Sequence, residues 1–157
     1  MCPRRRLGEE SNLDAGFRGS VTRWLVKEEP DHFSFDDLVR ENGTDWNGVH
    51  NALALRHLKA MRPAEQVLYY HSGRVRACVG VARVGTVPRP DPSDARGSWT
   101  VRLEPVRSLD RPVSLTEIRA AAPTEGFALV RMPRLSVMPV PAAAWSWILA
   151  ASRGRGR

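Results

Sequence analysis

Two tryptophans stand beside polar and charged side chains: Trp24 begins the segment WLVKEEPD, and Trp46 begins the segment WNGVHN. An aromatic ring offers flat apolar faces, and neighbouring amides and charges offer directed hydrogen bonds. A site for one planar ligand needs this combination. A flipped-out or free nucleobase is such a ligand, because it has two π faces and a hydrogen-bonding edge. The candidate binding residues are Trp24, Lys27, Glu28, Trp46, Asn47, Asn51, Ser72, Trp99, Arg134 and Ser136.

Several of these residues also fit a purely structural role. Trp24 leads an apolar run, which favours burial in the core, whereas Trp99 fits the core and a pocket equally well. Trp46 lies in polar sequence that predicts a loop, so we expect it to be partly exposed at a concavity. Asn51 could serve only to cap a helix, and Ser72 could serve only in a turn.

The sequence contains none of the common catalytic motifs. It has no nucleophile elbow, no zinc-protease helix motif, no phosphate-binding loop and no dinucleotide fingerprint. The 4 histidines lack the spacing of metal ligands. Cys2 and Cys78 are too far apart for a metal motif or a disulfide framework, and Cys78 lies in an apolar run that predicts burial. We therefore expect a protein that is not an enzyme and that uses no metal or cofactor.

Length and composition indicate one domain with two polar ends. A chain of 157 residues with 42% hydrophobic residues can build one core. Residues 1–20 are polar and aperiodic, which predicts a disordered arm, and residues 152–157 form a basic Arg-Gly tail after a domain at residues 21–151. No apolar run reaches the roughly 18 residues of a membrane span. We therefore expect no membrane segment and a monomer in the bacterial cytoplasm or nucleoid.

The charge of the chain is compatible with a nucleic-acid partner. The net charge is +7, but residues 20–151 carry 17 basic and 14 acidic side chains, so the expected domain is only mildly basic. Such a domain would gain affinity from one captured base and a few arginine contacts, and the Arg-Gly tail would add nonspecific attraction to phosphates.

Local patterns predict an α+β domain built on a small, strongly bent sheet. Apolar or alternating runs between turn signals predict strands at residues 22–27, 67–71, 78–87, 98–106 and 135–140, all in one curved sheet. Residues 88–97 predict a loop. Capping signals predict helices that begin after Ser34, Asn51 and Ser114, and proline at the first helical position predicts a helix at Pro141.

Four motifs in this order resemble those of the EVE domain family: WLVKEEPD, WNGVHN, LYYHS and RLSVMPV. The resemblance extends over residues 24–149 and implies a PUA-like pseudobarrel, in which short peripheral helices pack around a mixed curved sheet. It also implies a reader of a modified base in DNA or RNA, similar to the YTH domains that hold N6-methyladenine in an aromatic cage. In the matching positions Trp46 would be a cage wall, and Lys27 and Glu28 would lie on the pocket rim or on the side that reads the base edge.

The chain differs from the usual residues of the family motifs at four positions: Glu28 replaces serine, Asn47 replaces aspartate, His50 replaces arginine and Ala52 replaces tyrosine. The Glu28 carboxylate could accept a hydrogen bond from an exocyclic amino group, and Ala52 removes apolar area from a possible wall. Two other functions stay open: a PUA-like RNA-binding module without specificity for modification, and a protein-interaction domain with a degenerate pocket.

Overall fold

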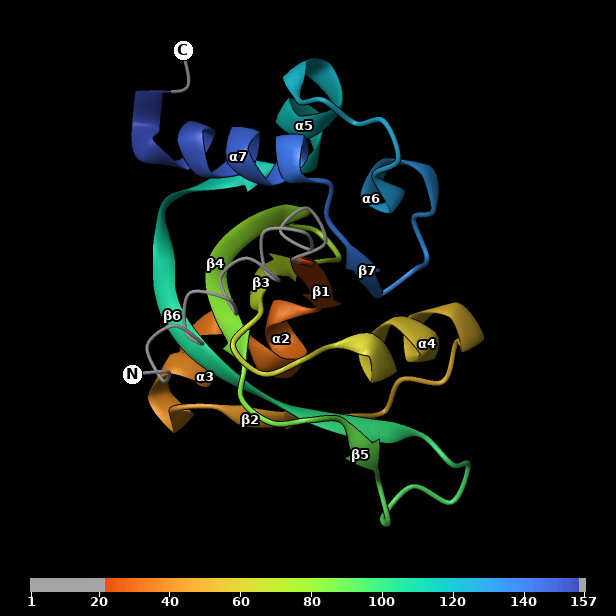
Figure 1. The fold of residues 1–157 in the computed structure, drawn as a ribbon. Helices are drawn as coiled ribbons and strands as arrows, with labels where there is room; N and C mark the ends of the chain where they lie inside the picture. Colours follow the sequence, from red (N-terminus) through yellow and green to blue (C-terminus); the bar gives the residue numbers. More distant parts are fainter. Residues whose placement is uncertain (1–21, 156–157) are drawn as a thin grey trace, which may run out of the picture.

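Strands from the whole length of the domain form one sheet. The computed structural model describes residues 22–155. Within them, the strands pair in the order β2-β6-β4-β3-β1-β7, and β5 pairs with β6 outside this path (Figure 1). The strands are β1 (Trp24–Glu28), β2 (Thr44–Trp46), β3 (Gln66–His71), β4 (Ala77–Val84), β5 (Arg89–Pro90), β6 (Trp99–Ser114) and β7 (Val137–Pro139).

Strand β1 lies deep in the sheet. It pairs in parallel with β3 and antiparallel with β7. Trp24, Leu25 and Val26 are all buried, which explains why this strand is an unbroken apolar run and does not alternate. The strand ends on the half-buried Lys27 and Glu28, so its polar end marks the place where the core opens.

Strand β6 gives the sheet its curvature. It has 16 residues and pairs with both β2 and β4. Its register with β4 shifts between Cys78 and Gly80 and again between Val81 and Ala82. Irregularities of this kind bend a strand and increase its twist. In Figure 1, β6 accordingly curves around β4 and β3.

Short helices surround this sheet, and their starts follow local capping chemistry. Ser34 Oγ accepts the Asp37 N–H and the Asp37 carboxylate accepts the Ser34 N–H; Ser114 and Glu117 form the same reciprocal pair. Asn51 Oδ1 accepts the Ala54 N–H. The helices are α2 (Pro30–Phe33), α3 (Phe35–Glu41), α4 (Ala52–Ala60), α5 (Leu115–Ala121), α6 (Ala128–Arg131), α7 (Ala142–Ala150) and the π-helical η1 (Ala151–Arg155).

The curved sheet leaves an open seam. In the part of the chain that the structure describes, β2 is one edge of the sheet and β7 is the other. Helix α4 packs against both β7 and β6, and in Figure 1 it lies between β7 and β2. Residues at the ends of β1 and β2 line a cavity that stays accessible.

All five segments predicted as strands lie in this sheet, and the predicted α+β fold with a mixed curved sheet is confirmed. The three capped helices also begin where predicted, whereas Pro141 is the N-cap of α7 and not its first residue. Cys78 is fully buried, as predicted. Within residues 22–155, no helix is long and apolar enough to cross a membrane.

Several short or irregular elements have no local sequence pattern and were not predicted. β2 has three residues and β5 has two, and β5 lies inside the predicted loop. The second half of β6, beyond the predicted strand, contains Pro112, and a proline normally argues against a strand because it has no N–H to donate. Helices α2 and α6 have four residues each, which is too short for a helical period to be seen.

The predicted ends of the domain need one correction. The tail was predicted to leave the domain at Ser152, but Ser152 is buried and its hydroxyl donates to the Leu149 carbonyl within η1. Helix η1 also packs against β6. The chain therefore stays attached to the core beyond residue 151. The arm predicted at residues 1–20 lies outside the described residues.

Candidate functional site

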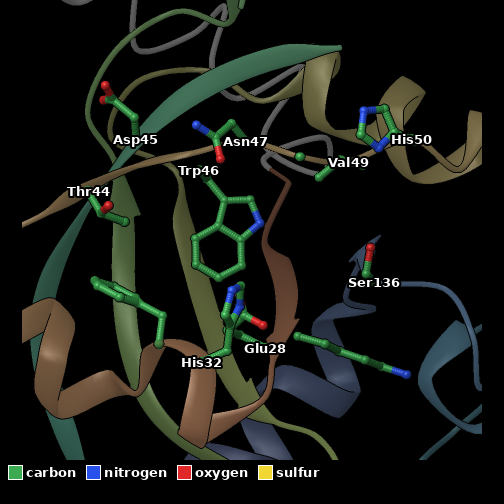
Figure 2. Close-up of a pocket in the computed structure, with 12 residues that line it drawn as sticks. Glu28, His32, Thr44, Asp45, Trp46, Asn47, Val49, His50 and Ser136 are labelled. Atoms are coloured by element: carbon green, nitrogen blue, oxygen red, sulfur yellow. The ribbon is translucent and has the colours of Figure 1, made fainter. Parts of the chain in front are cut away.

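A cavity of about 510 Å³ lies at the open seam of the sheet, and we call it the seam cavity. Its size is within the roughly 300–1,000 Å³ of small-molecule sites. Both edges of the sheet contribute to it: β2 and the loop after it on one side, and β1, α2 and the residue before β7 on the other (Figure 2). The lining residues are Lys27, Glu28, His32, Phe33, Thr44, Asp45, Trp46, Asn47, Gly48, Val49, His50 and Ser136.

Trp46 forms the aromatic wall of the seam cavity. It is the last residue of β2, where it pairs with Val101 of β6. Its ring meets the ring of Tyr69 edge to face, with centroids 5.5 Å apart and planes at 84°. In Figure 2, the indole projects from β2 into the space above Glu28 and His32.

The structure corrects the prediction of a partly exposed Trp46 in a loop, because the residue lies in a strand and only 8% of its surface is exposed. The edge-to-face contact with Tyr69 covers part of the indole. Only the remaining accessible part is available to a ligand.

Two buried hydroxyl groups, one from Thr100 in β6 and one from Ser98 just before β6, fix the loop that follows Trp46. Thr100 Oγ1 donates to the Trp46 carbonyl at 3.0 Å, and Ser98 Oγ donates to the Val49 carbonyl at 2.7 Å. Between them, Gly48 has a φ of +76°, a conformation that side chains other than glycine adopt at a cost. These contacts leave the exposed Asn47 at the mouth of the cavity.

His50 closes one end of the cavity by joining it to the loop after β5. Its Nε2 lies 2.6 Å from Asp94 Oδ2, and its Nδ1 lies 2.7 Å from Arg96 Nη2. Because an arginine can only donate, Nδ1 is the accepting nitrogen and Nε2 carries the hydrogen that is donated to Asp94. His50, which replaces the arginine of the family motif, therefore holds the loop after β5.

Glu28 presents a fixed carboxylate to the cavity. Its Oε1 accepts the Glu29 N–H at 2.9 Å, and its Oε2 lies 3.1 Å from His32 Nδ1. The side chain of Glu28 is 25% exposed. Two donors on its own segment thus hold an acceptor group in place before any ligand arrives.

Lys27 lies at the rim, beside Ser136. Its backbone N–H donates to the Ser136 carbonyl at 3.0 Å, and its ammonium donates to the Pro133 carbonyl at 2.8 Å. The ammonium also lies 5.6 Å from the centre of the Tyr70 ring. Partial burial lowers the pKa of Lys27. The seam cavity therefore contains groups of both signs.

Side chains from β3 hold the segment that supplies His32 and Phe33. Tyr69 Oη donates to the Phe33 carbonyl at 2.6 Å, and His71 Nε2 accepts the Phe35 N–H at 3.1 Å. Burial raises the pKa of Tyr69 and lowers the pKa of His71. Phe35 then packs over Gly80, where an added Cβ would lie 2.5 Å from its ring. Helices α2 and α3 are thereby fixed to the sheet.

The structure brings together half of the predicted site residues. The seam cavity contains Lys27, Glu28, Trp46, Asn47 and Ser136. A second cavity of about 330 Å³ lies next to it and is lined by Asn51, Arg134 and the apolar residues Met132, Pro133 and Leu135. Pro133 links the two cavities, since its carbonyl accepts from Lys27.

Three predicted residues line neither cavity. Trp24 is buried and its indole N–H donates to Glu65 Oε1 at 2.7 Å, so the core interpretation is confirmed. Trp99 lies half-buried under the Lys59 ammonium, 4.6 Å from its ring centre. Ser72 donates its N–H to the Glu28 carbonyl at 3.0 Å. These three residues do not line the seam cavity.

Sequence reasoning missed other residues of the cavity. Thr44 and Asp45 adjoin the singled-out Trp46 motif and His50 lies within it, so that motif held a signal for them. His32 and Phe33 follow the WLVKEEPD motif directly, and the hydrogen bond from Tyr69 to the Phe33 carbonyl helps to hold α2 at the seam. Together the lining residues provide an aromatic wall, a fixed acceptor and an amide, which suits a planar heterocycle with N–H groups. Among residues 22–155, no three His, Cys, Asp or Glu side chains are grouped to hold a metal ion.

Comparison with known proteins finds a matching family and proteins of similar sequence and structure. A family model described as EVE domain matches residues 22–151. Thymocyte nuclear protein 1 of Gallus gallus is 27% identical over 177 residues, which cover 90% of this chain and 71% of that protein. An NMR structure of a Rhodopseudomonas palustris protein is 36% identical, with a TM-score of 0.79 and coverage of 86% of this chain and 95% of that one.

Two structures solved with nucleic acid share the fold. Human THYN1 in complex with 5-methylcytosine containing DNA has a TM-score of 0.75 at 24% identity and covers 83% of this chain and 97% of its own. The YTH domain of Zygosaccharomyces rouxii MRB1, in complex with N6-methyladenosine RNA, has a TM-score of 0.54 at 15% identity, with coverage of 83% and 86%. The predicted pseudobarrel and its similarity to YTH domains are confirmed at the level of the fold.

Proposed function

The chain belongs to the EVE domain family, and from this premise we propose that it binds nucleic acid by capturing one unpaired or flipped-out base in the seam cavity. The observation that carries this proposal is the placement of Trp46 beside Glu28 and Asn47 in one accessible cavity. A base stacked on an aromatic ring gains roughly 1–3 kcal/mol. The nearby polar groups can then read its edge.

A preference for a modified base is the finer part of this proposal. A methyl group offers no hydrogen bond, so aromatic and apolar contact is the means of recognising it. Trp46 supplies that contact in the seam cavity. The human relative in complex with 5-methylcytosine containing DNA and the YTH domain in complex with N6-methyladenosine RNA give the proposal a precedent in the same fold.

The proposed role is binding and not catalysis. The adjacent His71 and Ser72 are the one pair that resembles a base and a nucleophile in the sequence. His71 Nε2 already accepts the Phe35 N–H, and this contact holds α3 on the sheet. That nitrogen is therefore engaged in the fold and not free to activate a hydroxyl group.

Substitution of Trp46 tests base capture. Because Trp46 is largely buried, truncation to alanine would cost about 3–5 kcal/mol of stability, so Trp46→Leu is the better variant: it keeps apolar volume and removes the aromatic face. We expect Trp46→Leu to lose most of the preference for oligomers with 5-methylcytosine or N6-methyladenine over unmodified ones. Fluorescence anisotropy with single-stranded DNA and RNA at one stated salt concentration measures this ratio.

The matched control is Trp147→Leu, since Trp147 is half-buried in α7 and does not line the cavity. This variant should keep the preference of the unaltered protein. A Trp46→Leu protein that is folded by circular dichroism and still prefers the modified oligomers would show that the seam cavity does not read the base.

A further inference from the structure

Two carboxylates line the seam cavity in the described chain, and they differ in their surroundings. Asp45 is 49% exposed and faces two arginines, at 3.8 Å from Arg89 Nη2 and 3.9 Å from Arg102 Nη1. The side chain of Glu28 is 25% exposed, and its carboxylate contacts two groups that are near it in the sequence, the Glu29 N–H and His32 Nδ1. Each Glu28 oxygen can accept a further hydrogen bond. Glu28 is therefore the better-placed acceptor for a ligand.

Glu28 also lies next to the aromatic wall. Tyr69, whose ring packs against Trp46, has its pKa raised mainly by burial and further by the negative charge of Glu28. In Figure 2, Glu28 and His32 lie directly beyond the edge of the Trp46 indole. A flat ligand that rests on Trp46 thus turns one edge toward the Glu28 carboxylate.

From this juxtaposition we infer that Glu28 selects bases that carry an exocyclic amino group, of the cytosine, adenine and guanine types, against thymine and uracil. This inference rests on the proposed function. A carboxylate can only accept hydrogen bonds, and the amino group of cytosine or adenine is a donor that suits it. Thymine and uracil present one N–H between two carbonyl oxygens, so a carboxylate that accepts from this N–H also lies against a carbonyl oxygen, which its negative charge repels.

The selection is compatible with base modification. A methyl group at C5 of cytosine leaves the 4-amino group intact, and a single methyl group on N6 of adenine leaves one N–H. 5-Methylcytosine and thymine carry the same ring and the same methyl group, and they differ only in the groups at positions 3 and 4. Trp46 would contact both bases equally, so a difference in their binding reports on the edge that faces Glu28.

The test uses labelled oligomers that are abasic except at one central position. In the DNA arm this position holds 5-methylcytosine or thymine, and in the RNA arm it holds cytosine or uracil. We expect the unaltered protein to bind the amino-bearing base about tenfold more tightly, which corresponds to about 1.4 kcal/mol, in whichever backbone it binds. Glu28→Gln should reduce this ratio to about threefold or less, because glutamine can also donate to a carbonyl. Glu28→Ser serves as a second variant.

Glu29→Gln is the matched control, since Glu29 is exposed, is the next residue and does not line the cavity. It removes the same charge and should keep the tenfold ratio. Equal binding of 5-methylcytosine and thymine, or an unchanged ratio in both Glu28 variants, would overturn the inference and leave base capture standing. Oligomers with one base that bind no better than the fully abasic oligomer would instead overturn the proposed function, and the inference with it.

Discussion

At the scale of single residues, two neighbours of His71, Phe35 and Asp36, interact with it in ways that depend on its protonation state. Its Nε2 accepts the Phe35 N–H, which only a neutral ring can do. Burial lowers the pKa of His71 from 6.5, and the charge of Asp36 opposes this effect in part. The folded state therefore favours the neutral ring more strongly than the unfolded chain does.

This linkage predicts a loss of stability in mild acid. The contribution of His71 is fully present above the unfolded pKa of about 6.5 and decreases as the pH falls through the lowered folded pKa. We expect the free energy of unfolding in urea to fall between pH 7.5 and pH 5. His71→Gln, which can accept the same N–H and does not titrate, should flatten this dependence. The same slope in both proteins would show that another group is responsible.

At the scale of elements, the short strand β2 depends on β6 for its position. The buried Thr100 hydroxyl donates to the carbonyl of Trp46, so β6 fixes both the strand and the start of the loop at the cavity mouth. An element of three residues has too few contacts of its own to hold an aromatic wall.

Removing this hydroxyl should loosen the wall. Thr100→Val keeps the shape of the side chain but leaves the Trp46 carbonyl without its donor, which typically costs about 1–3 kcal/mol. We expect a lower midpoint of urea unfolding and weaker binding of modified oligomers. Thr116→Val on the exposed face of α5 is the control and should change stability by less than about 0.5 kcal/mol. Equal stability of the two variants would contradict the role given to Thr100.

At the scale of the whole molecule, the proposed base capture must be separated from attraction between the basic chain and phosphates. The net charge is +7, and Arg153, Arg155 and Arg157 supply part of it. Deletion of residues 152–157 would remove both the positive charge and the buried Ser152, so a loss of charge could not be separated from damage to the fold. Replacing the three arginines with glutamine changes the charge and keeps Ser152.

We expect this triple variant to bind modified and unmodified oligomers more weakly by the same factor. Its dependence on salt should decrease by roughly 0.7–0.9 in logarithmic slope per lost phosphate contact, as counterion release predicts. Anisotropy across a salt series measures both quantities. If the triple variant loses its preference for modified oligomers while Trp46→Leu keeps it, then charge and not base capture carries recognition.

The amino-acid sequence by itself determined the features that depend on near neighbours. Ser34, Asn51 and Ser114 cap helices as predicted, because a cap needs only the next few residues. The apolar or alternating patterns that predicted five strands are likewise local, and all five segments contain strands of the sheet. Lys27, Glu28, Trp46 and Asn47 meet at the seam cavity, and the motifs that contain them mark the family.

Only the tertiary structure decided which of these side chains share a cavity. Trp24 and Trp46 both begin singled-out motifs, yet Trp24 points into the core toward Glu65 and Trp46 faces the seam. Tyr69 holds α2, the helix that contains His32, at the seam, and β2 exists because β6 pairs with it. Each of these outcomes depends on contacts between residues far apart in the chain, and local sequence patterns carry no record of such contacts.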